Sequence, residues 1–246
     1  EWFYCTFKFS KPKNLQKIAV IGGGTMGSGI TIAAMKAGLE VIMIERNTKT
    51  LDQGRSKVLR VLERDVQKSR LTEAKKSTLM QLYSGATDYS KLQGVDLVIE
   101  AVYEDMEVKK EVFKALDRSL PEQTILASNT SYLDIDEIAS VTKRPQNVIG
   151  LHFFSPANIM RLLEIVVPER ASDEVIATGF DLAKKMKKIP VRAGNCDGFI
   201  GNRILSAYTE VASFMMEDGA SPYEIDQAVR AFGYPIGPYQ MFDLAG

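Results

Sequence analysis

Short apolar runs alternate with longer amphipathic stretches through most of the chain. The runs are rich in β-branched residues and have the length of strands that are buried on both faces of a sheet. They lie at residues 17–21, 40–44, 95–102, 124–128, 148–154, 162–167 and 190–192. Helical spacing of apolar residues predicts helices at 28–37, 51–82 (broken in two at Leu71-Thr72), 107–120, 134–141 and 173–187. This alternation predicts an α/β protein with a Rossmann-type, doubly wound and mostly parallel sheet.

The alternation of strands and helices stops near Asn195. Only two helical patterns follow, at 203–218 and 222–232. We therefore expect a Rossmann domain over residues 16–194 and, over residues 195–246, the beginning of an all-α domain that is incomplete. Residues 1–15 mix aromatics and lysines without clear periodicity and are predicted to be a linker or tag. Both ends have the look of internal sequence, so we expect the chain to be a piece of a longer polypeptide.

Composition narrows the function classes. The chain has 246 residues, of which 45% are hydrophobic and 25% charged, and its formal net charge is zero. Balanced charge argues against a nucleic-acid-binding role, which normally needs a basic excess. No apolar run approaches the roughly 20 residues that span a bilayer, so we expect no membrane insertion. Cys5 and Cys196 lack metal-type spacing, and we predict no metal site and a reducing compartment.

A glycine-rich turn follows the first predicted strand. Gly22, Gly24 and Gly27 form G-x-G-x-x-G, in which the glycines allow a tight turn, close approach of a pyrophosphate and helix packing. Thr25 and Met26 lie inside this turn, next to the helix N-terminus that would face the phosphates.

The acidic residue after the second predicted strand is Glu45. A carboxylate there can accept both ribose hydroxyls of adenosine and would repel a 2′-phosphate, so NAD is favoured over NADP as cofactor. Arg46 next to it weakens that preference. The competing interpretation is a glycine turn with a structural role alone.

His152 is the only histidine of the chain and the group best suited to move protons near neutral pH. A single histidine in an apolar strand is more often a core residue, so the residues around His152 must show whether it is catalytic.

The basic stretch from Leu51 to Leu82 also has two interpretations, namely a solvated helical hairpin or a surface that meets an acidic ligand tail.

Five motifs in order carry a family resemblance. They are the glycine turn, Ser128-Asn-Thr-Ser131, Gly150-Leu-His-Phe-Phe-Ser-Pro156, Leu162-Leu-Glu-Ile-Val166 and Gly198-Phe-Ile-Gly-Asn-Arg203. From about Lys17 to the last residue, the sequence resembles the L-3-hydroxyacyl-CoA dehydrogenases of fatty-acid β-oxidation. The resemblance implies NAD-dependent oxidation of an L-3-hydroxyacyl-CoA to the 3-ketoacyl-CoA.

Within this family, the sequence resembles most the dehydrogenase region of peroxisomal multifunctional enzymes. Ser155-Pro-Ala157 carries this resemblance, because monofunctional mitochondrial members usually have asparagine in place of the serine. That branch implies a hydratase domain upstream in the same chain and a peroxisomal location, with the mitochondrial matrix as the alternative. The family also implies a homodimer through the helical domain.

The resemblance also implies roles for individual residues. His152 matches the family's catalytic histidine and Glu164 its carboxylate partner, while Ser131 and Asn202 match residues that hydrogen-bond the substrate oxygen. Taken singly, Ser131 and Asn202 are typical caps of helices or turns. The alternative for Glu164 is a surface glutamate, but its apolar neighbours favour a buried position, where a carboxylate needs a partner. Cofactor contacts are implied for three further residues, Glu104, Lys109 and Asn129.

Two departures from the family pattern accompany these matches. Tyr132 stands where the family more often has a small residue, and the helical domain is incomplete. Two other functions therefore stay open: a dehydrogenase of a smaller 3-hydroxy acid, and a non-catalytic NAD-binding or structural homologue.

Overall fold

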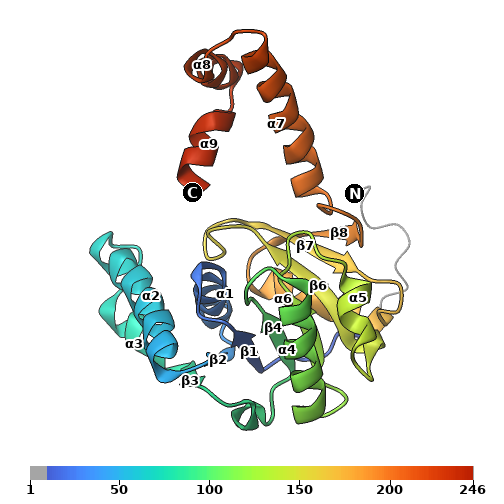
Figure 1. The fold of residues 1–246 in the computed structure, drawn as a ribbon. Helices are drawn as coiled ribbons and strands as arrows, with labels where there is room; N and C mark the ends of the chain where they lie inside the picture. Colours follow the sequence, from blue (N-terminus) through green and yellow to red (C-terminus); the bar gives the residue numbers. More distant parts are fainter. Residues whose placement is uncertain (1–9, 246) are drawn as a thin grey trace. The chain divides into compact units, whose positions relative to one another are not determined.

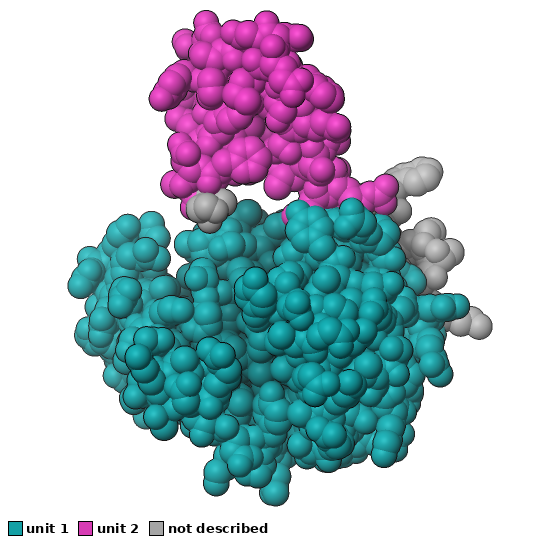
Figure 2. Space-filling model, viewed as in Figure 1, with its two compact units in different colours: residues 1–199 teal, residues 200–246 magenta. Residues whose placement is uncertain are grey.

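The computed structural model describes residues 10–245. The chain divides into two compact units, Glu1–Phe199 and Ile200–Gly246, which Figure 2 shows in different colours. Each unit has its own secondary structure and is described by itself.

Unit 1 is built on an eight-stranded sheet. Its strands are β1 (Lys17–Ile21), β2 (Glu40–Ile44), β3 (Tyr83–Ala86), β4 (Leu97–Glu100), β5 (Ile125–Ser128), β6 (Val148–Phe153), β7 (Leu162–Val167) and β8 (Ile189–Gly194). The strand order is β3-β2-β1-β4-β5-β6-β7-β8, and every neighbouring pair is parallel except β6 and β7. The predicted doubly wound, mostly parallel sheet is therefore confirmed.

Helices cover both faces of this sheet (Figure 1). One core contains residues of α1 (Thr25–Lys36), α2 (Thr48–Gln67), α3 (Glu73–Gln81) and α6 (Asp173–Lys185). The other core contains residues of α4 (Met106–Ser119), α5 (Ile135–Ser140) and the 3-10 helix η1 (Tyr89–Leu92), whereas η2 (Pro145–Asn147) precedes β6. Burial of both faces explains why the strands read as continuous apolar runs instead of alternating patterns.

Several boundaries differ from those predicted. Helix α1 begins at Thr25 instead of Ser28, because the glycine turn itself winds into the first helical turn, where the Ser28 N–H donates to the Gly24 carbonyl. Strand β3 was absent from the prediction because Tyr83–Ala86 is a partly exposed edge strand without an apolar run. The predicted break at Leu71-Thr72 is confirmed, since the Thr72 hydroxyl caps α3 by accepting the Lys75 N–H.

Part of the predicted linker packs on unit 1. The Lys13 N–H donates to the Thr178 hydroxyl at 2.9 Å, and Leu15 is 1% exposed within a core group. The rest of that prediction, residues 1–9, lies outside the described residues.

Unit 2 contains three helices within its described residues: α7 (Gly201–Glu217), α8 (Pro222–Phe232) and α9 (Pro238–Ala245). The two predicted helices correspond to α7 and α8. Helix α9 was not predicted, and its start is held by buried Asp226, whose carboxylate accepts the N–H groups of Tyr239 and Gln240. Among residues 10–245, no helix is both long and apolar enough to cross a membrane.

Candidate active site

The candidate site lies at one edge of the sheet. The carboxyl ends of the parallel strands β1, β4, β5 and β6 meet there, and antiparallel β7 begins at the same edge. In doubly wound sheets, ligands bind outside the carboxyl ends of the strands where the strand order reverses, which here is between β1 and β4.

The glycine turn connects β1 to α1 by close backbone packing. Gly22 has φ +99°, and a Cβ on it would lie 2.7 Å from the Ala101 carbonyl oxygen. A Cβ on Gly27 would overlap the Gly22 carbonyl oxygen at 1.8 Å. A Cβ on Gly24, by contrast, would meet nothing within 4 Å. The first and third glycines are thus required by packing, and the second leaves open space beside the turn.

That open space faces the start of α1. The first turn of α1 has no acidic side chain and no side-chain cap, and Thr25 in it is exposed while Met26 packs partly on the core. The first N–H groups of a helix lack intrahelical partners and carry its positive dipole end. These features fit the pyrophosphate of a dinucleotide such as NAD.

Glu45 lies against this turn. Its Oε1 accepts the Gly23 N–H at 2.7 Å and its Oε2 accepts the Arg46 N–H at 3.1 Å. Burial alone would raise the pKa of Glu45, but the hydrogen bond from Gly23 and those that follow it outweigh burial and lower the pKa below 4.5. The side chain is therefore an anion at the end of β2, where a ribose acceptor is expected.

His152 and Glu164 form a buried pair. Antiparallel pairing of β6 and β7 places these two residues directly opposite each other, and His152 Nδ1 lies 2.7 Å from Glu164 Oε2. The two residues are 4% and 1% exposed. No hydrogen bond joins Nε2 of His152 to another of the described residues. The interpretation of Glu164 as a surface glutamate is wrong, because a residue in the middle of β7 is covered on both sides of the sheet.

Two phenylalanine rings contact the imidazole of His152. The ring centroid of Phe154 lies 4.4 Å from the imidazole centroid, and that of Phe199 lies 5.6 Å from it. The ring planes are tilted by 45° and 58°, which are favourable geometries for aromatic pairs. The imidazole is therefore fixed by one polar and two apolar contacts.

A second buried pair of a carboxylate and a basic group, Glu100 and Lys109, lies at the same edge. Lys109 on α4 is 1% exposed, and its Nζ lies 2.7 Å from Glu100 Oε1 and 3.2 Å from Glu104 Oε2. Glu100 ends β4 and accepts two further hydrogen bonds at 2.7 Å, from the Val102 N–H and the Ser128 hydroxyl. Glu100 and Ser128 were not predicted as part of the site. A single acid at the end of an apolar run was the available signal, because a buried carboxylate needs a partner.

Glu104 connects this network to the loop after β5. Its Oε1 accepts the Thr130 hydroxyl and, at 2.7 Å, the Ser131 N–H. Burial would raise the pKa of Glu104, but the Thr130 hydrogen bond and the charge of Lys109 outweigh it and lower the pKa below 4.5. The structure thus brings together predicted residues Glu104, Lys109 and Ser131.

Asn129 makes hydrogen bonds with the backbone at the ends of β4 and β6. Its N–H donates to the Glu100 carbonyl at 2.8 Å, and its side-chain Oδ1 accepts the Phe153 N–H at 2.9 Å. This side chain therefore holds the end of β6, next to His152. Asn202 belongs to unit 2, where it lies in the first turn of α7.

Lys188 has a position that its sequence did not indicate. Lys188 follows the basic end of α6, and its Nζ donates to the carbonyls of Ala157 and Met160. It is 9% exposed, and burial lowers its pKa below 10.5. Lys188 thereby fastens the loop that connects the strand of His152 to the strand of Glu164.

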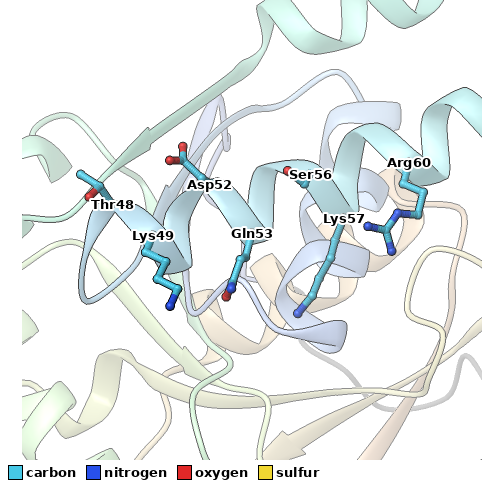
Figure 3. Close-up of a pocket in the computed structure, with 7 residues that line it drawn as sticks. All are labelled: Thr48, Lys49, Asp52, Gln53, Ser56, Lys57 and Arg60. Atoms are coloured by element: carbon cyan, nitrogen blue, oxygen red, sulfur yellow. The ribbon is translucent and has the colours of Figure 1, made fainter.

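A basic groove runs along the first half of α2 (Figure 3). It has a volume of about 700 Å³ and is lined by Thr48, Lys49, Asp52, Gln53, Ser56, Lys57 and Arg60. The three cations outnumber the single acid, and Lys57 Nζ reaches the Gly23 carbonyl at 3.4 Å. The groove therefore adjoins the glycine turn.

Within residues 10–245, no group of three or more histidine, cysteine or acidic side chains could hold a metal ion.

Most of the chain matches two domain models of one protein family. Residues 17–196 match the family described as "3-hydroxyacyl-CoA dehydrogenase, NAD binding domain", and residues 198–246 match "3-hydroxyacyl-CoA dehydrogenase, C-terminal domain". The chain belongs to the 3-hydroxyacyl-CoA dehydrogenase family. Its cofactor is therefore NAD, in agreement with the glycine turn and Glu45.

Similar proteins place the chain within this dehydrogenase family. It is 48% identical over 237 residues to the peroxisomal bifunctional enzyme of Danio rerio, a match that covers 96% of this chain and 32% of that protein. FadB2 of M. tuberculosis has a similar structure, with a TM-score of 0.92, 37% identity, and coverage of 95% of this chain and 84% of that one. For (S)-3-hydroxybutyryl-CoA dehydrogenase PaaH1 from Ralstonia eutropha, the TM-score is 0.90 at 35% identity, covering 95% and 83%.

The chain spans about a third of the length of the curated relatives it matches. Several of those relatives are named peroxisomal or glyoxysomal multifunctional proteins.

Proposed function

We propose that the protein oxidises L-3-hydroxyacyl-CoA to 3-ketoacyl-CoA with NAD, as a step of fatty-acid β-oxidation. The observation that supports this proposal best is the buried His152–Glu164 pair, with 2.7 Å between Nδ1 and Oε2, at the sheet edge that also carries the glycine turn. Oxidation of an alcohol needs a base for the hydroxyl proton and an acceptor for the C3 hydride. Bound NAD supplies the hydride acceptor.

His152 is the proposed base. Because Glu164 accepts from Nδ1, the neutral imidazole keeps its proton there and presents an unprotonated Nε2 to the substrate hydroxyl. Glu164 then stabilises the imidazolium that forms. In the reverse direction, the same imidazole returns the proton to the ketone oxygen.

We propose that Ser131 and Asn202 hydrogen-bond the substrate oxygen. Glu104, Lys109 and Asn129 form the part of the site that binds the cofactor. Because Lys109 is 1% exposed beneath Glu104, we assign it to holding Glu104 in place. Asn129 similarly acts through the backbone of Phe153. Glu45 accepts the ribose hydroxyls, and Gly22, Gly24, Thr25, Met26 and Gly27 form the phosphate turn.

The basic groove on α2 is proposed to meet the acidic nucleotide tail of CoA. Lys49, Lys57 and Arg60 line it, and charged tails of this kind are attracted by such surfaces. We expect Lys57→Ala to raise KM for a 3-hydroxyacyl-CoA several-fold. KM for the matching N-acetylcysteamine thioester, which lacks the nucleotide, should not change. Equal effects on both substrates would contradict the proposal.

The wider context is also proposed from the relatives. A hydratase domain upstream in the same polypeptide and a peroxisomal location follow from the resemblance to multifunctional enzymes. The proposed domain division at residues 194/195 rests instead on the end of the strand–helix alternation near Asn195. The mitochondrial matrix is the alternative location. A homodimer through the helical domain is a further proposal, and sedimentation analysis of the full-length protein tests it.

NADH formation tests the activity directly. We expect turnover with L-3-hydroxybutyryl-CoA and none with the free 3-hydroxy acid. Turnover of the free acid alone would favour a dehydrogenase of small 3-hydroxy acids. If the full-length protein binds NADH but is no faster than its His152→Ala variant, the non-catalytic alternative is correct.

A further inference from the structure

Phe199 is the last residue of unit 1 and has an unusual backbone. Its φ is +48°, a region that bulky side chains rarely adopt, and its N–H donates to the Cys196 carbonyl at 3.0 Å. Such a conformation persists only where the surrounding structure imposes it, and it is frequent at functional sites. The residue is also 2% exposed, so its ring is held inside the protein.

The segment before Phe199 is anchored firmly. Asn195 follows β8, its Oδ1 accepts the Ile135 N–H at 3.0 Å, and its Nδ2 donates to Asp134 and Asp136 at 2.6 Å. The loop is thus tied to the start of α5. The Phe199 ring then joins the same buried core as Ile135.

The ring of Phe199 lies where the imidazole needs support. The hydrogen bond between Nδ1 and Glu164 does not by itself hold the imidazole of His152 against small rotations about its Cα–Cβ and Cβ–Cγ bonds. Apolar contacts with the imidazole stop these rotations, and they come from Phe154, at 4.4 Å, and Phe199, at 5.6 Å. Phe154 is two residues from His152, directly after the end of β6. Phe199 is far along the chain, and its ring reaches the same place from a left-handed backbone.

We propose that Phe199 is a positioning residue of the dehydrogenase reaction, which fixes the plane of the His152 ring and so the direction of its Nε2. This inference rests on the proposed function, because it concerns the group that moves the proton. This role also accounts for the left-handed backbone of Phe199. The loop that leads into α7 packs an aromatic ring against the base.

The kinetic test compares two buried phenylalanines. Phe199→Leu keeps an apolar side chain but removes the ring, and Phe113→Leu does the same in the same core without contact to His152. We expect Phe199→Leu to lower kcat about tenfold or more with an unchanged Kd for NADH, since misplacement of a reacting group by about 1 Å can reduce rates about 10²-fold. Phe113→Leu should leave kcat of the folded protein within about twofold of the wild type. Equal losses of kcat in the two variants would overturn the proposal.

An NMR readout separates this inference from the proposed activity. His152 is the only histidine, so its ¹⁵N-labelled imidazole gives one unambiguous set of signals. We expect narrow ring signals of one neutral tautomer, with the proton on Nδ1, in the wild type and in the Phe113→Leu control. In Phe199→Leu, Glu164 still keeps the proton on Nδ1, but the ring is less firmly held, so we expect exchange broadening of the imidazole signals in relaxation-dispersion measurements. An inactive wild type would refute the proposed function, whereas relaxation dispersion identical to that of the wild type in Phe199→Leu would refute the role of Phe199.

The left-handed backbone of Phe199 is tested by two further variants. Phe199→Ala and Phe199→Gly both remove the ring, so both should lose kcat equally. Glycine adopts a positive φ without strain, so the glycine variant should melt at the higher temperature. A higher melting temperature for the alanine variant would show that the left-handed backbone is not imposed, and would overturn this part of the inference.

Discussion

Two buried carboxylates at the same sheet edge make an instructive pair. Glu164 on β7 and Glu100 on β4 are 1% and 0% exposed, and each lies 2.7 Å from a basic nitrogen. The basic partner differs: His152 for Glu164 and Lys109 for Glu100. An imidazole changes its protonation near neutral pH, whereas an ammonium group stays charged. The chemistry of the partner therefore decides which carboxylate can take part in proton transfer.

The surroundings reinforce this difference. Glu100 accepts from Lys109, the Val102 N–H and the Ser128 hydroxyl, a set of donors that fixes both of its oxygens. Such a network holds the ends of β4, β5 and α4 together. His152, in contrast, uses Nδ1 for Glu164, and its Nε2 is the nitrogen that we propose for the substrate hydroxyl. We therefore assign the Glu100–Lys109 pair to structure and the Glu164–His152 pair to chemistry.

The largest expected effect on stability comes from Lys109→Met. The change leaves Glu100 buried without its counter-ion, and breaking a buried ion pair in this way costs about 3–5 kcal/mol. Chemical denaturation measures the loss of unfolding free energy. Lys114→Met is the matched control on the same helix, because Lys114 pairs with Glu111 at the exposed surface, where ion pairs contribute little to stability. Equal losses in the two variants would contradict a structural role for the buried pair.

A double mutant sharpens the assignment. Glu100→Gln combined with Lys109→Met removes both charges, so the protein should be more stable than with Lys109→Met alone. We expect a coupling energy of about 1–3 kcal/mol between the two positions in denaturation experiments. Additive losses would mean that the two side chains act independently.

A smaller effect is expected from Ser128→Ala. The change removes one donor to Glu100 Oε2, which is buried, and a lost hydrogen bond of this kind costs about 1–3 kcal/mol. Ser119→Ala is the control, since the exposed Ser119 hydroxyl donates only to the Ala115 carbonyl of its own helix. The free energy of unfolding should fall clearly in the first variant and by less than about 0.5 kcal/mol in the second.

The smallest effect concerns pH. The pKa of Glu104 is lowered in the folded protein, so its contribution to stability is present above pH 4.5 and is lost as pH falls through the folded pKa. Thr130→Val removes a hydrogen bond to the Glu104 carboxylate, so this pKa should return toward 4.5 and the acid loss should begin at a higher pH. Melting temperatures recorded from neutral to acidic pH test this shift. Identical pH profiles for the variant and the wild type would contradict it.

Local patterns made some of these features predictable. The glycine turn and Glu45 follow from spacing alone, because a strand, a tight turn and a helix succeed one another within a few residues. The apolar runs predicted seven of the eight strands. Strand β3 was missed because it is a partly exposed edge strand and has no apolar run. Helix α9 was missed because its start depends on a hydrogen bond to Asp226, which belongs to another helix.

Other parts of the site depend on contacts between distant segments. The pairing of His152 with Glu164 was implied by family resemblance, but its geometry comes from the antiparallel register of β6 and β7. Phe199 and Lys188 gave no local signal, because the groups that they contact are distant along the chain. Such positions become visible only once the chain has folded.

One measurement tests the central claim most directly: the single-turnover rate of NADH formation from L-3-hydroxybutyryl-CoA in Glu164→Gln and Glu100→Gln. Glutamine at 164 no longer stabilises the imidazolium, so we predict that hydride transfer slows about 10²-fold or more, with nearly unchanged NADH affinity. Glu100→Gln should lower stability but keep the rate of the folded, NAD-bound protein within about tenfold of the wild type. A wild-type rate in Glu164→Gln, or a large loss of its NADH binding, would contradict the account.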